Sequence, residues 1–226
     1  MATPLNYDAL LSAHRNIIDK NNVSQGLIYL QITRGSAGDR DFIFPDPETT
    51  TQTVVMFSQN KENLVDNPSA VSGIKVISIE DQRWGRRDIK TTQLLYPSIG
   101  KMMAQKLNAD DAWMVEDGYV TEGTSNNAYI IKDGKIITRA KSYAILHGIT
   151  RSAIMRFAEE AEMEIEERNF SINEAINADE AFITSASSFV TPVVNIDGQN
   201  ISHGSPGPMT QRLRKIYIDE SMKTAI

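Results

Sequence analysis

The sequence has 226 residues, of which 41% are hydrophobic and 23% charged, and no apolar run reaches the roughly 18 residues that a membrane-spanning helix needs. Its formal net charge of -6 argues against charge-driven binding to nucleic acid, and the absence of cysteine excludes disulfides and sulfur-bound metals. The three histidines argue against a histidine-rich metal site. The acidic net charge favours chemistry on small molecules. The opening MATPLNYDAL lacks the cationic and apolar pattern of a signal peptide, so we expect a cytoplasmic protein.

The first part of the chain predicts a small unit with one helix and two strands. Apolar residues spaced by three and four predict an amphipathic helix over 7–21, and runs rich in branched residues predict strands at 27–33 and 53–57. The segment SAGDRDFIFPDP is rich in turn formers and predicts a surface loop between the strands. The polar stretch SQNKENLVDNPSAVSG is typical of a linker, so we predict domains at 1–66 and 67–226.

The remaining residues alternate between strands and helices. Strands are predicted at 75–79, 180–185 and 190–196. Helices are predicted at 98–107, 150–163 and 209–223. Aspartate-glycine pairs predict turns at Asp117–Gly118, Asp133–Gly134 and Asp197–Gly198. Strands and hairpins mixed among helices indicate an α/β fold with a mixed α+β sheet rather than a strictly doubly wound one.

Lys90 stands out in the run RRDIKTTQLL because an apolar stretch begins four residues after it. A lysine held away from water loses its proton more readily and can then form a Schiff base with a carbonyl group. Lys90 follows a predicted strand, and for this chemistry we expect its amine to be buried. The alternative is a lysine whose stem packs against apolar groups while its amine reaches water, which is the commoner arrangement.

Glu122 stands at the end of a short predicted strand in GYVTEGTSNNAYI, next to a glycine. A carboxylate in this position is either an ordinary turn residue or the partner of a cation. A protonated pyridine nitrogen is one such cation, and a carboxylate that keeps this nitrogen protonated makes pyridoxal phosphate an electron sink.

Two further segments have the composition of anion sites. In LHGITR, Gly148 precedes a predicted helix whose first backbone N–H groups are free to bind an anion, with Thr150 as a cap. In FITSASSFVTP, a strand runs into Ser185 and Ala186, whose small size lets backbone and hydroxyl donors approach a phosphate. An ordinary capped helix and an ordinary polar loop explain the same residues.

Taken in order, DIKTTQLL, VTEGTSNNAYIIKDGKIIT, LHGITR and ITSASSFVTPV resemble the class IV, fold type IV, pyridoxal-phosphate aminotransferases over nearly the whole chain. The resemblance implies a small N-terminal α/β domain and a larger C-terminal pseudo-barrel domain. It also implies pyridoxal 5′-phosphate as the cofactor, amino-acid and 2-oxo-acid substrates, and a homodimer. No metal, nucleic acid or membrane is implied.

The resemblance gives three residues roles at the reacting end of the cofactor. Lys90 would form the Schiff base with the cofactor and move the proton between the substrate α-carbon and the cofactor. Glu122 would pair with the pyridine nitrogen, and Leu146 would pack against the ring.

The same resemblance implies a phosphate site made from two segments. The backbone amides of Ile149 and Thr150 would bind the 5′-phosphate together with Ser185 and Ala186. D-amino-acid transaminases often have a hydroxyl residue where this chain has Ala186, which leaves a main-chain donor there and removes a hydroxyl contact.

The segment YLQITRG resembles the D-amino-acid branch of the family, whose next loop grips the substrate carboxylate with an arginine and a histidine. This chain offers Arg40, but Phe42 stands about where the histidine would be. We therefore predict transamination between D-amino acids, such as D-alanine or D-glutamate, and 2-oxo acids. An aminodeoxychorismate lyase and a branched-chain or (R)-amine transaminase are alternatives on the same fold.

Members of this family carry a further stretch before the point that matches Met1. It contains strands of the small domain and an arginine that contacts the phosphate. We therefore expect the small domain to be incomplete here, and an inactive truncated fragment is a third alternative.

Overall fold

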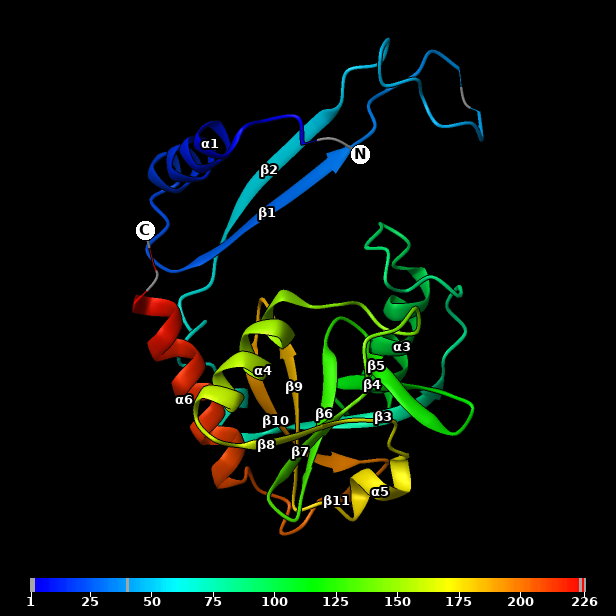
Figure 1. Ribbon diagram of the computed structural model, residues 1–226, viewed down its shortest axis with the longest axis vertical. Helices are drawn as coiled ribbons and strands as arrows, with labels where there is room; N and C mark the ends of the chain where they lie inside the picture. Colours follow the sequence, from blue (N-terminus) through cyan, green and yellow to red (C-terminus); the bar gives the residue numbers. More distant parts are fainter. Residues whose placement is uncertain (1–2, 40, 224, 226) are drawn as a thin grey trace. The chain divides into compact units, whose positions relative to one another are not determined.

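The computed structural model describes residues 3–39, 41–223 and 225 (Figure 1). The chain divides into two compact units, Met1–Leu64 and Val65–Ile226. Within the described residues, no helix has both the length and the apolar character that crossing a bilayer requires.

The first unit consists of α1 (Tyr7–Lys20) and an antiparallel hairpin of β1 (Gly26–Thr33) and β2 (Thr53–Asn60). The predicted helix and both predicted strands are confirmed, although β2 runs three residues further and takes up the start of the predicted linker. None of the described residues in this unit is buried. The hairpin therefore has no core of its own in this chain, and an isolated two-stranded hairpin is only marginally stable in water.

The second unit is built on a nine-stranded mixed sheet. Its strands are β3 (Ile74–Glu80), β4 (Asp111–Glu116), β5 (Tyr119–Gly123), β6 (Asn127–Lys132), β7 (Lys135–Thr138), β8 (Glu164–Glu167), β9 (Glu180–Ser185), β10 (Phe189–Ile196) and β11 (Gln199–Asn200). Its helices are α2 (Pro68–Ser72), α3 (Leu95–Lys106), α4 (Ile149–Glu160), α5 (Ile172–Ile176) and α6 (Pro208–Lys223). The strand order is β5-β4-β3-β10-β9-β6-β7-β8, with β11 paired to β10.

The sheet must curl, because of how β5 connects to β6. These strands stand first and sixth in the sheet order, which in a flat sheet would place them about 24 Å apart. The chain links Gly123 to Asn127 in four Cα steps, which reach at most about 15 Å. A backbone hydrogen bond of 2.9 Å from the Gly123 N–H to the Asn126 oxygen closes this connection. The curl therefore brings the end of β5 to the start of β6.

Strand β6 packs against other residues on both of its faces. This packing fixes the position of Asn127, its first residue. Tyr129 and Ile131 pack into a cluster with α4 and α6, whereas Ala128 and Ile130 pack into the cluster that contains Trp113. Alternate side chains of a strand point to opposite faces of the sheet, so both layers of the core hold the same strand.

Several predicted boundaries shift in the second unit. Helix α3 begins at Leu95 rather than at 98, and α4 ends at Glu160 rather than at 163. The predicted linker contains the short helix α2, and β8 and α5 were not predicted. The turns predicted from aspartate-glycine pairs are present, with positive φ at both residues of each pair.

Candidate active site

Glu122 lies at the centre of the candidate site, in β5, with its side chain buried. Its Oε1 accepts a hydrogen bond from Arg83 Nη1 at 2.6 Å. Its Oε2 accepts from the Leu146 backbone N–H at 3.0 Å and from Asn127 Nδ2 at 3.1 Å. Because each carboxylate oxygen accepts about two hydrogen bonds, Oε1 retains a lone pair for one further donor.

Asn127 connects Glu122 to the loop that precedes α4. Its Nδ2 also donates to the Leu146 carbonyl oxygen at 2.9 Å. Its Oδ1 lies so close to Gly148 that a Cβ added to this glycine would be 2.5 Å away. Asn127 therefore holds the loop against β6, and the close approach requires glycine at position 148.

The start of α4 has the free amides that an anion site needs. Gly148 is its N-cap, in an extended conformation and without a side-chain cap bond. The Ser152 N–H donates to the Gly148 oxygen at 3.0 Å, so the amides of Ile149, Thr150 and Arg151 precede the helical ladder. The positive end of the helix dipole favours an anion at these amides. The prediction that Thr150 caps the helix is wrong, because Thr150 is already its second residue.

The turn between β9 and β10 supplies hydroxyl groups. Ser185 Oγ accepts from the Ser188 backbone N–H at 3.1 Å and lies 2.7 Å from Ser188 Oγ. Ala186 and Ser187 lie exposed between them. Because one of the Ser185 and Ser188 hydroxyl groups donates to the other, the proton of the second hydroxyl is available to a ligand.

The strand register places this turn beside Asn127. In the antiparallel pair of β6 and β9, Asn127 stands opposite Thr184, and Ser185 is the next residue. Asn127 also contacts Glu122 and the loop before α4. The structure thus brings the predicted carboxylate and the predicted helix start together through the Asn127 side chain, and the strand register places the predicted serine turn beside the same residue.

Arg83 joins Glu122 to a second buried carboxylate. Its Nε and Nη2 donate to the two oxygens of Asp81 at 2.9 and 2.7 Å. Asp81 Oδ2 also accepts from Thr121 Oγ1 at 2.7 Å and lies 3.5 Å from Arg87 Nε. Because Arg87 also binds Glu116 through two nitrogens, two arginines and three carboxylates form one connected network.

The two carboxylates differ in pKa because they are bound differently. Burial raises the pKa of Glu122, and the charge and hydrogen bond of Arg83 offset only part of this effect, so its pKa lies above the ordinary value. Burial also raises the pKa of Asp81, but its bonds to Arg83 and Thr121 and the charge of Arg87 outweigh it, so its pKa is lowered. A bound cation therefore changes the protonation of Glu122 more readily than that of Asp81.

Lys90 lies in the loop between β3 and α3, with its side chain exposed. The prediction of a buried amine directly after a strand is wrong for this structure, because β3 ends at Glu80 and the apolar stretch that follows Lys90 is itself exposed. The loop is attached to the segment before α4. Arg87 N–H donates to the Tyr143 oxygen at 2.9 Å, and the Arg86 guanidinium lies 4.4 Å from the Tyr143 ring centroid.

Sequence reasoning did not find three residues that build this site, namely Asp81, Arg83 and Asn127. A usable signal was present in DQRWGRRDIK, where arginines and aspartates alternate ahead of Lys90. Of the predicted residues, Leu146 is half-buried and reaches Glu122 through its backbone. The predicted substrate residue Arg40 lies outside the described residues.

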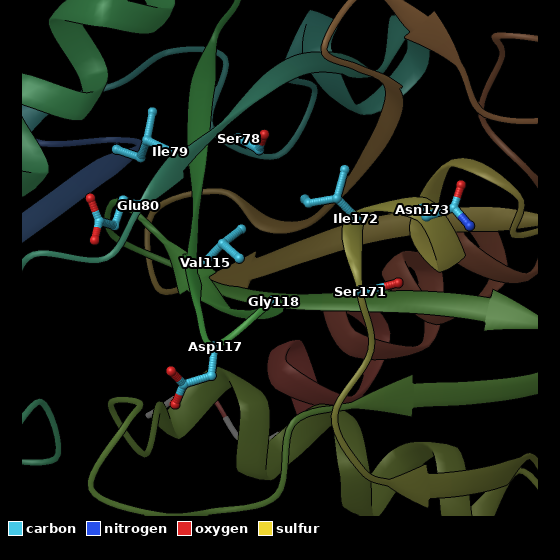
Figure 2. A pocket seen from close by; sticks show the side chains of 9 residues that line it. All are labelled: Ser78, Ile79, Glu80, Val115, Asp117, Gly118, Ser171, Ile172 and Asn173. Atoms are coloured by element: carbon cyan, nitrogen blue, oxygen red, sulfur yellow. The ribbon is translucent and has the colours of Figure 1, made fainter.

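A pocket elsewhere on the second unit is lined by none of the predicted site residues. It has a volume of about 590 Å³ and lies between the end of β3, the turn joining β4 to β5, and the start of α5 (Figure 2). Its polar lining groups include Glu80, Asp117 and Asn173. The candidate site around Glu122 is separate from this pocket.

The sequence matches the family Amino-transferase class IV over residues 1–196. The chain belongs to the class IV aminotransferase family. The D-alanine aminotransferase of Staphylococcus aureus (strain MSSA476) is 38% identical over 213 residues, which are 93% of this chain and 74% of that protein. The D-alanine aminotransferase of Bacillus licheniformis is 38% identical over 221 residues, 95% of this chain and 76% of that protein.

Solved structures of other aminotransferases share the fold of this class IV aminotransferase. The branched-chain amino acid aminotransferase of Escherichia coli superimposes with a TM-score of 0.84 at 25% identity, over 97% of this chain and 73% of that chain. The branched-chain amino acid aminotransferase of Thermobaculum terrenum, in its PLP form, gives a TM-score of 0.80 at 23% identity, over 100% of this chain and 74% of that chain. The predicted family and fold type IV architecture are confirmed.

Proposed function

We propose that this class IV aminotransferase uses pyridoxal 5′-phosphate to exchange an amino group between a D-amino acid and a 2-oxo acid. The observation that carries the proposal is the cluster around Asn127, where a buried carboxylate, a helix start and a serine turn meet. The similarity to D-alanine aminotransferases supports the choice of D-amino acids.

The residues of the site fit this cofactor by the chemistry of their donors and acceptors. Glu122 Oε1 has an acceptor position for a ring N–H, beside the bond from Arg83. The amides of Ile149 and Thr150 and the hydroxyl of Ser185 are donors suited to a phosphate. Ala186 is exposed in the same turn and contributes a backbone N–H.

When bound, pyridoxal phosphate supplies an electron sink that stabilises negative charge on the substrate α-carbon. Glu122 keeps the ring nitrogen protonated, and Arg83 holds the Glu122 carboxylate in place. The helix start and the serine turn fix the phosphate end. Lys90 provides the primary amine that takes the α-proton and returns it, so it acts as the general acid and base.

We also propose that the enzyme works as a homodimer. Helix α3, which follows the Lys90 loop, exposes apolar side chains along one stripe, namely Leu95, Ile99 and Met102. Clustered exposed apolar side chains of this kind are typical of a contact surface. Helix α3 begins five residues after Lys90. A second copy packed against this stripe would therefore also shield the exposed Lys90 loop from solvent.

The test of the proposed function begins with the bound cofactor. Borohydride reduction of the protein loaded with pyridoxal phosphate, followed by peptide mapping, is expected to label Lys90. Lys90→Ala should lose the label and the transamination activity, whereas Lys141→Ala, at an exposed lysine of a neighbouring loop, should keep both. A label found on any other lysine would contradict the assignment.

A panel of paired D- and L-amino acids then tests the substrate class. We expect D-alanine or D-glutamate with a 2-oxo acid to give the fastest turnover. Faster turnover of L-leucine or of an (R)-amine would favour a branched-chain or (R)-amine transaminase instead. Pyruvate released from aminodeoxychorismate without an amino acceptor would favour the lyase.

A further inference from the structure

Arg214, on α6, is outside the set of residues assigned to the cofactor, yet it is bonded to the turn that carries Ser185. Its Nη1 donates to the Ser188 oxygen at 2.9 Å and to the Val190 oxygen at 2.7 Å. Its Nη2 donates to the Val65 oxygen at 2.7 Å. The residue is 8% exposed, so a buried cation is bound here by three neutral carbonyl groups.

The two carbonyl groups on Nη1 lie on either side of Phe189. This residue has φ 59, in the left-handed region that costs energy for any side chain with a Cβ. A single donor bonded to the oxygens before and after Phe189 holds the chain in this conformation. The Ser188 oxygen also accepts from Thr191 Oγ1 at 3.0 Å. The shape of the turn therefore depends on contacts to its carbonyl groups.

Helix α6 is attached at its beginning to β9, the strand that leads into this turn. Glu180, the first residue of β9, accepts from the backbone N–H groups of Met209 and Thr210 at 2.9 and 2.8 Å. The helix then packs along β10 and β9 (Figure 1). With its start fixed at one end of β9, α6 brings Arg214 to the turn at the other end.

We propose that Arg214 is a positioning residue that clamps the Ser185–Ser188 turn in its phosphate-binding shape and places a positive charge behind it. The inference rests on the proposed function, because it requires this turn to hold the cofactor phosphate. A buried guanidinium stays protonated, and its attraction for a phosphate is stronger in a partly dry site than in water.

The experiment compares two ligands that differ only in the phosphate, pyridoxal 5′-phosphate and pyridoxal. Dissociation constants for both are measured by absorbance titration of the full chain and of Arg214→Met and Arg214→Lys. We expect Arg214→Met to weaken binding of pyridoxal 5′-phosphate by about tenfold, equivalent to about 1.4 kcal/mol, and to leave pyridoxal binding nearly unchanged. Arg214→Lys keeps the positive charge but loses the guanidinium bonds to the carbonyl groups on both sides of Phe189. Its affinity for pyridoxal 5′-phosphate should therefore lie between that of the unchanged protein and that of Arg214→Met.

Lys215→Met is the matched control, because Lys215 is a cation on the same helix whose side chain is 77% exposed and pairs with Asp219. This variant should bind both ligands as the unchanged protein does. If Arg214→Met does not fold, the ratio of the two dissociation constants in Arg214→Lys decides the question.

Equal weakening of both ligands, or a lower melting temperature with both affinities unchanged, would overturn the clamp and leave Arg214 a purely structural role. Failure of the proposed function has a different signature. In that case the unchanged protein would show no preference for pyridoxal 5′-phosphate over pyridoxal, and both proposals would fall together.

Discussion

Arg83 is the residue on which the electrostatics of the site depend. It binds Asp81 through two nitrogens and Glu122 through a third, and only 13% of its side chain is exposed. A buried carboxylate without a cation is costly, and two of them in contact repel each other. Arg83 therefore makes it possible for Asp81 and Glu122 to lie in the same network.

Arg83→Met is expected to destabilise the protein by about 3 kcal/mol at pH 7, because it leaves two buried carboxylates without their shared partner. The pKa of Asp81 lies below its ordinary value of 3.8, so its stabilising contribution is present above that value and is lost as pH falls through the lowered pKa. The pKa of Glu122 is raised above 4.5, so its ionisation costs stability as pH rises through the raised value.

Arg83 lowers the pKa of both carboxylates, so Arg83→Met should raise both pKa values, and the two effects give one expectation for the pH profile. The difference in unfolding free energy between the unchanged protein and Arg83→Met should be largest near neutral pH and shrink on acidification, when the carboxylates take up protons. Urea unfolding at several pH values measures it. A difference that stays constant down to pH 3 would contradict the network.

Sequence reasoning singled out Glu122 and the two segments proposed to bind an anion, but it did not predict that Arg83 is the partner of Glu122. Glu122 is visible because a glycine and small polar residues follow it, which is a local pattern. Arg83 is 39 residues away in sequence and meets Glu122 only through the fold. The burial of Lys90 failed as a prediction for a related reason, since exposure depends on what covers a loop and not on its own residues.

At the scale of elements, the contact between β6 and α4 depends on one missing Cβ. Gly148→Ala is expected to push Asn127 Oδ1 away, because the added Cβ would be 2.5 Å from that oxygen. The displaced amide would lose the hydrogen bonds that Asn127 Nδ2 donates to Glu122 Oε2 and to the Leu146 oxygen. Overpacking of this kind costs about 1–3 kcal/mol. The melting temperature and the affinity for pyridoxal 5′-phosphate should both decrease.

Gly85→Ala is the control for this substitution, because an added Cβ there meets no atom within 4 Å. It removes the same freedom from the unfolded chain without a clash, so it should be neutral or slightly stabilising. If both variants behave alike, the Asn127 contact does not hold the loop.

The elements that local chemistry determines were predicted well, and the others were not. Aspartate-glycine turns identify the hairpins because both residues must adopt positive φ. Strand β8 (EIEE) has one apolar residue, and its pairing with β7 depends on the preceding helix delivering it there. Sequence periodicity also cannot show that β5 and β6 meet, because the curl is a property of the whole sheet.

At the scale of the whole molecule, the two units differ in how they are stabilised. The three hydrophobic clusters of the described chain consist of residues from 65 onward. We expect a fragment of residues 65–226 to unfold cooperatively, with a melting temperature close to that of the full chain. A fragment of residues 3–64 should show no sharp transition by circular dichroism. A cooperative transition of the small fragment would contradict this expectation.

The exposed stripe on α3 gives a second prediction at this scale. Met102, with 56% of its surface exposed, should lie in a contact between two copies. Met102→Glu is expected to raise the dissociation constant of the proposed homodimer by at least about tenfold, since it introduces a charge into an apolar contact. Gln105→Glu adds the same charge at another exposed position of α3 and should change it little. Sedimentation velocity over a range of concentrations measures both, and equal effects would place the contact elsewhere.

The parallel pairing of β3 with β10 has a consequence for biosynthesis. Strand β3 is complete at Glu80, but its neighbour on one side spans Phe189–Ile196 and leaves the ribosome much later. During translation the edge of β3 that later pairs with β10 is therefore unpaired, and a strand of another nascent chain could pair with it. We expect the newly made chain to depend on chaperones until β10 emerges, and to aggregate when translation stops before that point.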